Sequence, residues 1–166
     1  MTRVTGKRSG IALMTAVDLR HLLLKRVHSG PVWVEGFFTV GIANAVCVGE
    51  PVDRCESVRQ HYVPGTINII LVTNASFPHS ALVSAISIAT ESKTAAMLEH
   101  SIKSWTGQMG ATGTGTDSLV FVSGFGPKLQ YSGSHTKIGE LIGRVVKSGI
   151  GRGLHLIRRG PLECES

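Results

Sequence analysis

The stretch with the clearest potential for chemistry is 111–117 (Ala-Thr-Gly-Thr-Gly-Thr-Asp), which lies directly before the apolar run 119–122. Glycine lets a backbone approach a ligand closely, and hydroxyls beside bare N–H groups make a polar cradle. A flexible turn that ends on an aspartate explains the same letters, because short Gly/Thr loops are common. Taken alone, the stretch leaves a turn and a binding loop equally open.

Other residues suited to acid–base chemistry are dispersed. His135 lies in the first turn of a predicted helix, where the positive end of the dipole disfavours protonation. A neutral imidazole there can act as a base or a metal ligand, and an ordinary surface histidine is the alternative. His135 and Asp117 show no ligand spacing, so no metal is expected. The sequence contains no HExxH, GxSxG, P-loop or GxGxxG signature.

Composition indicates a folded chain. Of 166 residues, 42% are hydrophobic and 17% charged, which excludes a disordered protein. The net charge is +6, but the basic residues are scattered without interleaved aromatics, so nucleic-acid binding is not expected. Cys47, Cys55 and Cys164 lack CxxC spacing, which argues against a disulfide framework and favours the cytoplasm. No run reaches membrane-spanning length, so no membrane span is expected.

Periodicity and turn residues predict alternating strands and helices. The predicted strands are 10–14, 32–40, 66–73, 118–124 and 154–157, and the predicted helices are 15–28, 80–100 and 135–148. Thr15 and Asp18 have capping-box spacing, and Ser-Gly-Pro at 29–31 stops that helix. Glycines over 149–153 are expected to break the last helix. The pattern predicts one α/β domain over 1–166, with a mixed, mostly buried sheet and packed helices.

The predicted helix 80–100 carries few charges, because only Glu91 and Lys93 are charged between residues 80 and 98. We therefore expect it to be covered on most sides. One helical stripe collects small hydroxyls and a carboxylate: Ser80, Ser84, Ser87, Glu91 and Thr94. A solvent-facing stripe and a polar cavity lining are both open. Asn68 interrupts an apolar strand and must find partners if it is buried.

Six segments carry a resemblance to a known family. They are 13–18 (LMTAVD), 39–45 (TVGIANA), 64–70 (PGTINII), 89–95 (ATESKTA), 111–117 (ATGTGTD) and 132–143 (SGSHTKIGELIG). In this order they resemble the adenosylcobinamide amidohydrolase family, over about residues 10–149. Ser-Gly-Ser at 132–134 stands where the family tends to have Ala-Gly-Thr. Longer members carry an additional N-terminal portion, and if that portion closes the pocket, this chain is expected to bind corrinoid less well.

The resemblance implies an activity found in archaea and some bacteria. The enzyme hydrolyses the amide that joins the aminopropanol arm of adenosylcobinamide to the corrin ring, giving adenosylcobyric acid for coenzyme B12 synthesis. The expected partner is a corrinoid small molecule, and a homo-oligomer is compatible with the sequence. The cobalt arrives with the substrate, so no separate cofactor is expected. A corrinoid-binding protein without catalysis, or an amidohydrolase for another amide, remains open.

Our site hypothesis combines these residues. Asp117 or Glu91 activates a water, His135 shuttles a proton, and loop N–H groups stabilise the oxyanion. A threonine nucleophile, Thr114 or Thr116, is the second route. The predicted catalytic residues are Asp117, His135, Glu91 and Thr116, and the predicted substrate-binding residues are Thr112, Gly113, Thr114, Gly115, Asn68, Lys93 and Thr136.

Overall fold

The computed structural model describes residues 10–51 and 65–159, which form a mixed sheet with two helices on it. The strands are β1 (Leu23–Ser29), β2 (Val32–Val40), β3 (Ala45–Val46), β4 (Ile67–Thr73), β5 (Gly113–Thr114) and β6 (Ser118–Val122). The helices are the 3₁₀ turn η1 (Leu19–His21), α1 (His79–Glu99) and α2 (Lys137–Arg159). The predicted α/β class with a mixed sheet is confirmed.

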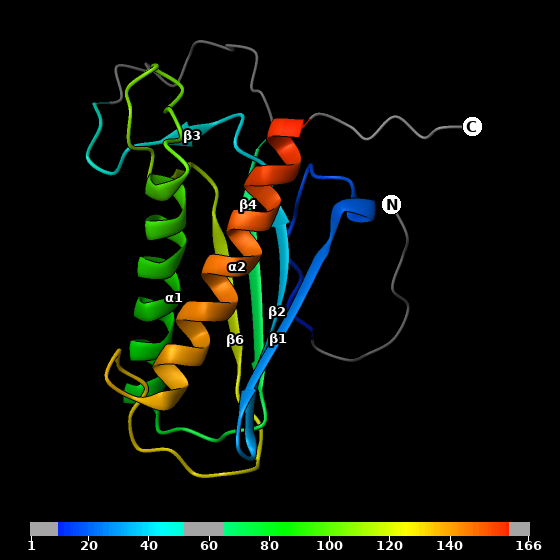
Figure 1. Ribbon diagram of the computed structural model, residues 1–166, viewed down its shortest axis with the longest axis vertical. Coiled ribbons are helices and arrows are strands. Elements are labelled where there is room, and N and C mark those ends of the chain that lie inside the picture. The colour runs from blue at the N-terminus through cyan, green and yellow to red at the C-terminus, as the bar shows by residue number, and fades with distance from the viewer. Residues whose placement is uncertain (1–9, 52–64, 160–166) are drawn as a thin grey trace.

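The main sheet has the strand order β1-β2-β4-β6. β1, β2 and β4 are antiparallel neighbours, and β6 runs parallel to β4 after the crossover through α1. Both long helices cover the same face, with α2 against β1 and β2 and α1 beside it (Figure 1). β3 and β5 form a separate two-stranded ladder at the end of the molecule where α1 finishes.

The core lies between this sheet face and α2. Phe38 on β2 and Ile69 on β4 are buried with Leu141 and Ile150 of the helix. A Cβ on Gly149 would stand 2.4 Å from the Phe38 ring, so the glycine lets the helix approach the sheet. This close packing explains why α2 continues through 149–153 to Arg159. The predicted break and the predicted strand 154–157 are both wrong.

The predicted helix 15–28 is also wrong. Asp18 caps only the short turn η1, accepting a hydrogen bond from the Arg20 N–H at 2.9 Å. The following residues form β1, which pairs with β2 through a two-residue turn at Gly30 and Pro31. Gly30 supplies the positive φ, +55°, in that turn. Pairing with β2 thus determined the local structure in place of the capping signal. The burial of β1 alternates from residue to residue, as in a strand. Residues 10–14 form no strand.

Strands 32–40, 66–73 and 118–124 and helix 80–100 are confirmed within one or two residues. The expectation that α1 is covered on most sides is wrong for the described residues, since Val83 is 65% exposed and Ile86 42%. Of the hydroxyl stripe, Ser84 and Ser87 are exposed and donate back to the carbonyls four residues earlier. Thr94 is half-buried and donates to the Thr112 carbonyl at 3.2 Å. In the described part of the chain, no helix is long and apolar enough to cross a membrane.

Candidate functional site

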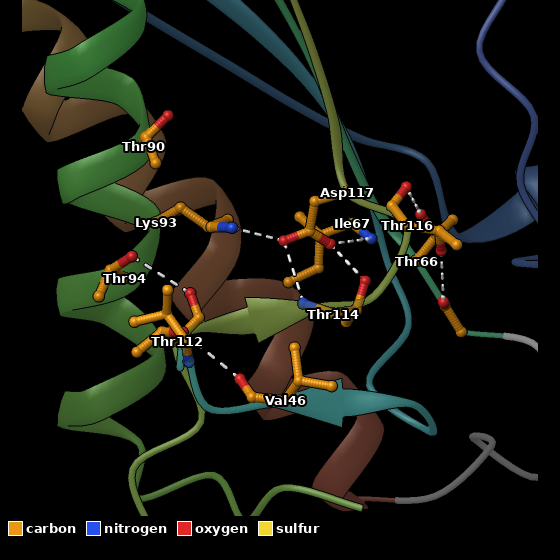
Figure 2. A network of polar contacts seen from close by, with 12 residues as sticks. Val46, Thr66, Ile67, Thr90, Lys93, Thr94, Thr112, Thr114, Thr116 and Asp117 are labelled. Atoms are coloured by element: carbon orange, nitrogen blue, oxygen red, sulfur yellow. Dashed lines mark hydrogen bonds and ion pairs between the residues drawn. The ribbon is translucent and has the colours of Figure 1, made fainter. Parts of the chain in front are cut away.

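A mostly buried ion pair between Asp117 and Lys93 forms the centre of the candidate site (Figure 2). The Lys93 Nζ lies 2.5 Å from Oδ2 of Asp117, and the two side chains are 13% and 17% exposed. The Ile67 N–H donates to Oδ1 at 3.1 Å, and the Thr114 N–H donates to Oδ2 at 3.1 Å. The Thr114 hydroxyl donates to Oδ1 as well. One carboxylate therefore joins α1, β4 and the loop before β6.

The loop sequence provides the space for this ion pair. Asp117 folds back onto the N–H of Thr114, three residues earlier, so the Gly/Thr stretch closes as a tight turn. A Cβ on Gly113 would lie 2.5 Å from both the Asp117 Oδ2 and the Lys93 Nζ. The glycine is therefore required by the approach of the lysine. The sequence left a turn and a binding loop open for 111–117, and the structure shows a turn built around this mostly buried ion pair.

The other threonine hydroxyls of the loop are also bonded within the protein. Thr116 Oγ1 donates to the Gly65 carbonyl at 3.1 Å, and Thr66 Oγ1 donates to the Thr116 carbonyl at 2.8 Å. Thr112 Oγ1 accepts from the Val48 N–H at 2.9 Å. These bonds clamp the loop to its neighbours. Gly115 and Thr116 are nevertheless exposed, so they form the part of the loop that a ligand can reach.

The bonding of Asp117 limits its chemistry. An ionised carboxylate has about four acceptor positions, and four donors already occupy them. A water could reach the carboxylate only by displacing one of these donors. The geometry therefore suits Asp117 as an anchor that orients Thr114 and Lys93 better than as a base for water.

His135 and Thr136 lie elsewhere, at the end of the molecule where α1 begins. With Ser80, Ser84 and Tyr131 they line an open pocket of about 390 Å³. Thr136 caps α2, since its hydroxyl accepts from the Gly139 N–H at 3.0 Å. His135 is exposed.

The two ends are separated along α1. Lys93 lies 9 to 13 residues after Ser84 and Ser80, which at 1.5 Å per residue is roughly 14 to 20 Å along the helix. The structure therefore does not bring His135 and Asp117 together. Glu91 is exposed and precedes Lys93 by two residues, so it points to the opposite side of the helix from the ion pair. Of the predicted catalytic residues, only Thr116 lies beside Asp117.

Asn68 lies next to the ion-pair site but faces the other side of the sheet, away from the helices. It is buried, and its Nδ2 donates to the Met14 carbonyl at 2.7 Å. Its Oδ1 has no partner among the described residues. This arrangement fixes the segment before η1 onto the sheet. In the described ranges, no group of three or more His, Cys, Asp or Glu side chains gathers in a way that could hold a metal ion.

One residue beside the loop was missed by the sequence reasoning. Asn44 precedes β3, and its side chain lies between Gly65 and Gly115. The available signal was a single amide in the small-residue segment 41–46.

Comparison with known proteins gives a consistent result. The family model described as adenosylcobinamide amidohydrolase matches residues 2–159. The chain belongs to this family. An adenosylcobinamide amidohydrolase of Methanosarcina mazei is 32% identical over 158 residues, which cover 89% of this chain and 68% of that protein. An uncharacterized protein of Methanocaldococcus jannaschii is 37% identical over 165 residues, 90% of this chain and 65% of that protein.

The chain thus spans about two thirds of the length of these two curated relatives. No solved structure matches it. In this chain, four of the six segments that resemble the family lie together around the ion pair. Segment 64–70 contributes Ile67, 89–95 contributes Lys93, and 111–117 contributes Asp117. Segment 39–45 joins them where Ala45 pairs with Thr114.

Proposed function

We propose that this chain hydrolyses the amide between the corrin ring and the aminopropanol arm of adenosylcobinamide, releasing aminopropanol and adenosylcobyric acid. Family membership supports the reaction class. The observation that carries the proposal is the meeting of four resemblance segments at one partly exposed loop. Four of the six segments therefore contribute to one polar site, although the same segments also supply core residues such as Ile69 and Ala89.

The surroundings suit a corrinoid. This molecule is large, apolar on its faces and ringed by amides, so its site requires broad contact and small polar groups rather than many charges. On the side of α1 that faces the loop, the charged residue between 80 and 98 is Lys93, which pairs with Asp117, and the exposed loop residues Gly115 and Thr116 are small. The cobalt enters with the substrate, and we propose no cofactor held by the chain itself.

The threonine route has better geometric support than a water activated by Asp117. The Thr114 hydroxyl donates to a carboxylate that Lys93 orients, which is the order nucleophile, base, orienting group. In this route the Thr114 oxygen bonds to the amide carbon, and its proton passes through Asp117 to the leaving amine. The C–N bond then breaks, and water hydrolyses the ester. Thr114 is 8% exposed, so the scissile amide must approach past Gly115.

Two variants test the nucleophile. Thr114→Ser keeps a hydroxyl and should retain turnover, whereas Thr114→Val should abolish it while staying folded. Mass spectrometry of wild-type protein quenched during turnover should show an adduct with the mass of the corrinoid acyl group. Full turnover by Thr114→Val would rule out this nucleophile.

The function itself is tested by incubating purified protein with adenosylcobinamide. The proposal predicts adenosylcobyric acid and free aminopropanol in equal amounts. Tight binding without product would favour a second candidate, a corrinoid-binding protein without catalysis. The observation behind that candidate is that four donors of the chain already bond the Asp117 carboxylate. Neither binding nor product would indicate an amidohydrolase for another amide.

A further inference from the structure

The side-chain amide of Asn44 has a buried oxygen without a hydrogen-bond partner among the described residues. A Cβ on Gly65 would stand 2.8 Å from its Oδ1, and one on Gly115 would stand 3.8 Å from its Nδ2, so the amide spans the gap between two backbone segments. The Oδ1 is buried and has no hydrogen-bond donor among the described residues. Exchanging the amide oxygen and nitrogen would only place an unpaired donor in the same buried position.

This arrangement does not favour stability. A buried polar atom without a partner costs about 1–3 kcal/mol, and an apolar replacement removes that cost. Residues that break such a rule concentrate at functional sites. An amide at position 44 is therefore better explained by what its other end faces.

The other end faces the exposed part of the candidate site. Among the described residues, a Cβ built on Gly115 would meet only the Asn44 nitrogen within 4 Å, so these residues leave space beside this glycine. Gly115 and Thr116 are exposed there, and the loop is fixed from behind by Asp117. Amide N–H groups that point toward such a space suit a carbonyl oxygen.

We propose that Asn44 is a substrate-binding residue, whose Nδ2 donates to an amide carbonyl oxygen of the corrinoid, and that Gly115 keeps this space free. The inference rests on the proposed function, because it takes an amide-ringed corrinoid as the ligand. It adds a residue and a contact that the sequence reasoning did not assign. Alanine at the two positions tests two different contributions to binding. Asn44→Ala removes the hydrogen-bond donor, and Gly115→Ala fills the space that the ligand would occupy.

The test measures the KM for adenosylcobinamide, the Kd for its product adenosylcobyric acid and the thermal midpoint of unfolding. Asn44→Ala should raise KM and Kd about tenfold or more, equivalent to about 1.4 kcal/mol, with a midpoint no lower than wild type. Gly115→Ala should raise KM without lowering the midpoint. Asn74→Ala is the matched control, since its amide is bonded at both ends, to the Trp33 N–H and the Pro31 carbonyl. It should lower the midpoint and leave KM unchanged.

The outcomes are separable. If wild-type protein turns over or binds the corrinoid and Asn44→Ala matches it in KM and Kd, the inference fails while the proposed function stands. A midpoint for Asn44→Ala well below wild type would show a structural role and overturn the inference as well. If wild-type protein neither hydrolyses nor binds adenosylcobinamide, the proposed function fails and the inference fails with it.

Discussion

The two ends of α1 look alike in sequence but differ in structure. At the Asp117 end, a loop of glycines and threonines is tied by buried bonds to three other segments. At the His135 end, a loop of glycines and serines leads to an exposed histidine beside an open pocket. The carboxyl ends of the parallel strands β4 and β6 lie at this second end, where open α/β sheets usually bind ligands. The comparison teaches that the composition of a loop does not identify a site. The hydrogen-bond partners of the loop's polar groups distinguish the two ends.

The largest effect is expected for Asp117→Ala. It removes the acceptor of four hydrogen bonds and leaves the mostly buried Lys93 without a counter-charge. Breaking a buried pair from one side typically costs 3–5 kcal/mol, so we expect a loss of about 3 kcal/mol in the free energy of unfolding by urea. A loss below about 1 kcal/mol would show that the ion pair contributes little to the fold, in contrast to our description of this end.

Two glycines of the same loop sharpen the comparison. Gly113→Ala places a methyl group 2.5 Å from the Asp117 and Lys93 side chains and should cost about 2 kcal/mol of stability. Gly115→Ala makes an ordinary van der Waals contact with the Asn44 nitrogen at 3.8 Å and should be neutral or slightly stabilising. Urea denaturation of the two variants checks this. Equal effects would mean that the loop is not organised around the ion pair.

A smaller effect is expected at the other end. His135 is exposed and no bond to it is found within the described ranges 10–51 and 65–159, so His135→Ala should change stability by less than about 0.5 kcal/mol. If the substrate binds at the Asp117 end, kcat and KM for adenosylcobinamide should stay within about threefold of wild type. A hundredfold loss of kcat would restore our initial hypothesis of a proton shuttle at His135.

The smallest expected effect concerns two carboxylates, the half-buried Glu50 near one end and the exposed Glu140 near the other. The Thr106 hydroxyl and the Cys47 N–H lower the pKa of Glu50. The Lys137 ammonium lowers the pKa of Glu140, with a further contribution from Arg144. Each stabilises the fold above its unfolded-state pKa, and this is lost as pH falls through the lower folded-state pKa.

Salt should separate the two carboxylates. Ions screen charge pairs between exposed groups but not bonds from neutral donors. In an NMR titration at high salt, the pKa of Glu140 should return toward its ordinary value while that of Glu50 stays low. A rise in both would mean that cations, rather than hydroxyls and N–H groups, hold Glu50.

Much of the fold was predictable from local signals. The near-continuous apolar letters of 66–73 predicted a central strand, and β4 lies between β2 and β6. The helix prediction for 15–28 was wrong, because the capping pair is a local helix signal, whereas the strand β1 is defined by its pairing with β2. The glycines of 149–153 misled for a related reason, since the contact with Phe38 that accommodates them crosses more than a hundred residues.

The site was predicted in part. The Gly/Thr loop and Lys93 were both predicted as site residues and lie together, because the local sequence correctly predicted the turn and the helix that hold them. The distance from His135 to Asp117 depends on the length of α1 and on its direction relative to β6. A short sequence motif does not predict this arrangement. Asn44 was missed because its significance lies in a buried amide oxygen without a partner among the described residues, and bonding partners are visible only in three dimensions.

The central claim is that the corrinoid contacts the Asp117 end, and amide hydrogen exchange with and without adenosylcobinamide tests it most directly. We predict that exchange slows in peptides covering 41–46 and 112–117 when the corrinoid is added, and that peptides covering 130–136 are unchanged. Protection confined to 130–136 would contradict the account and place the substrate at the His135 pocket.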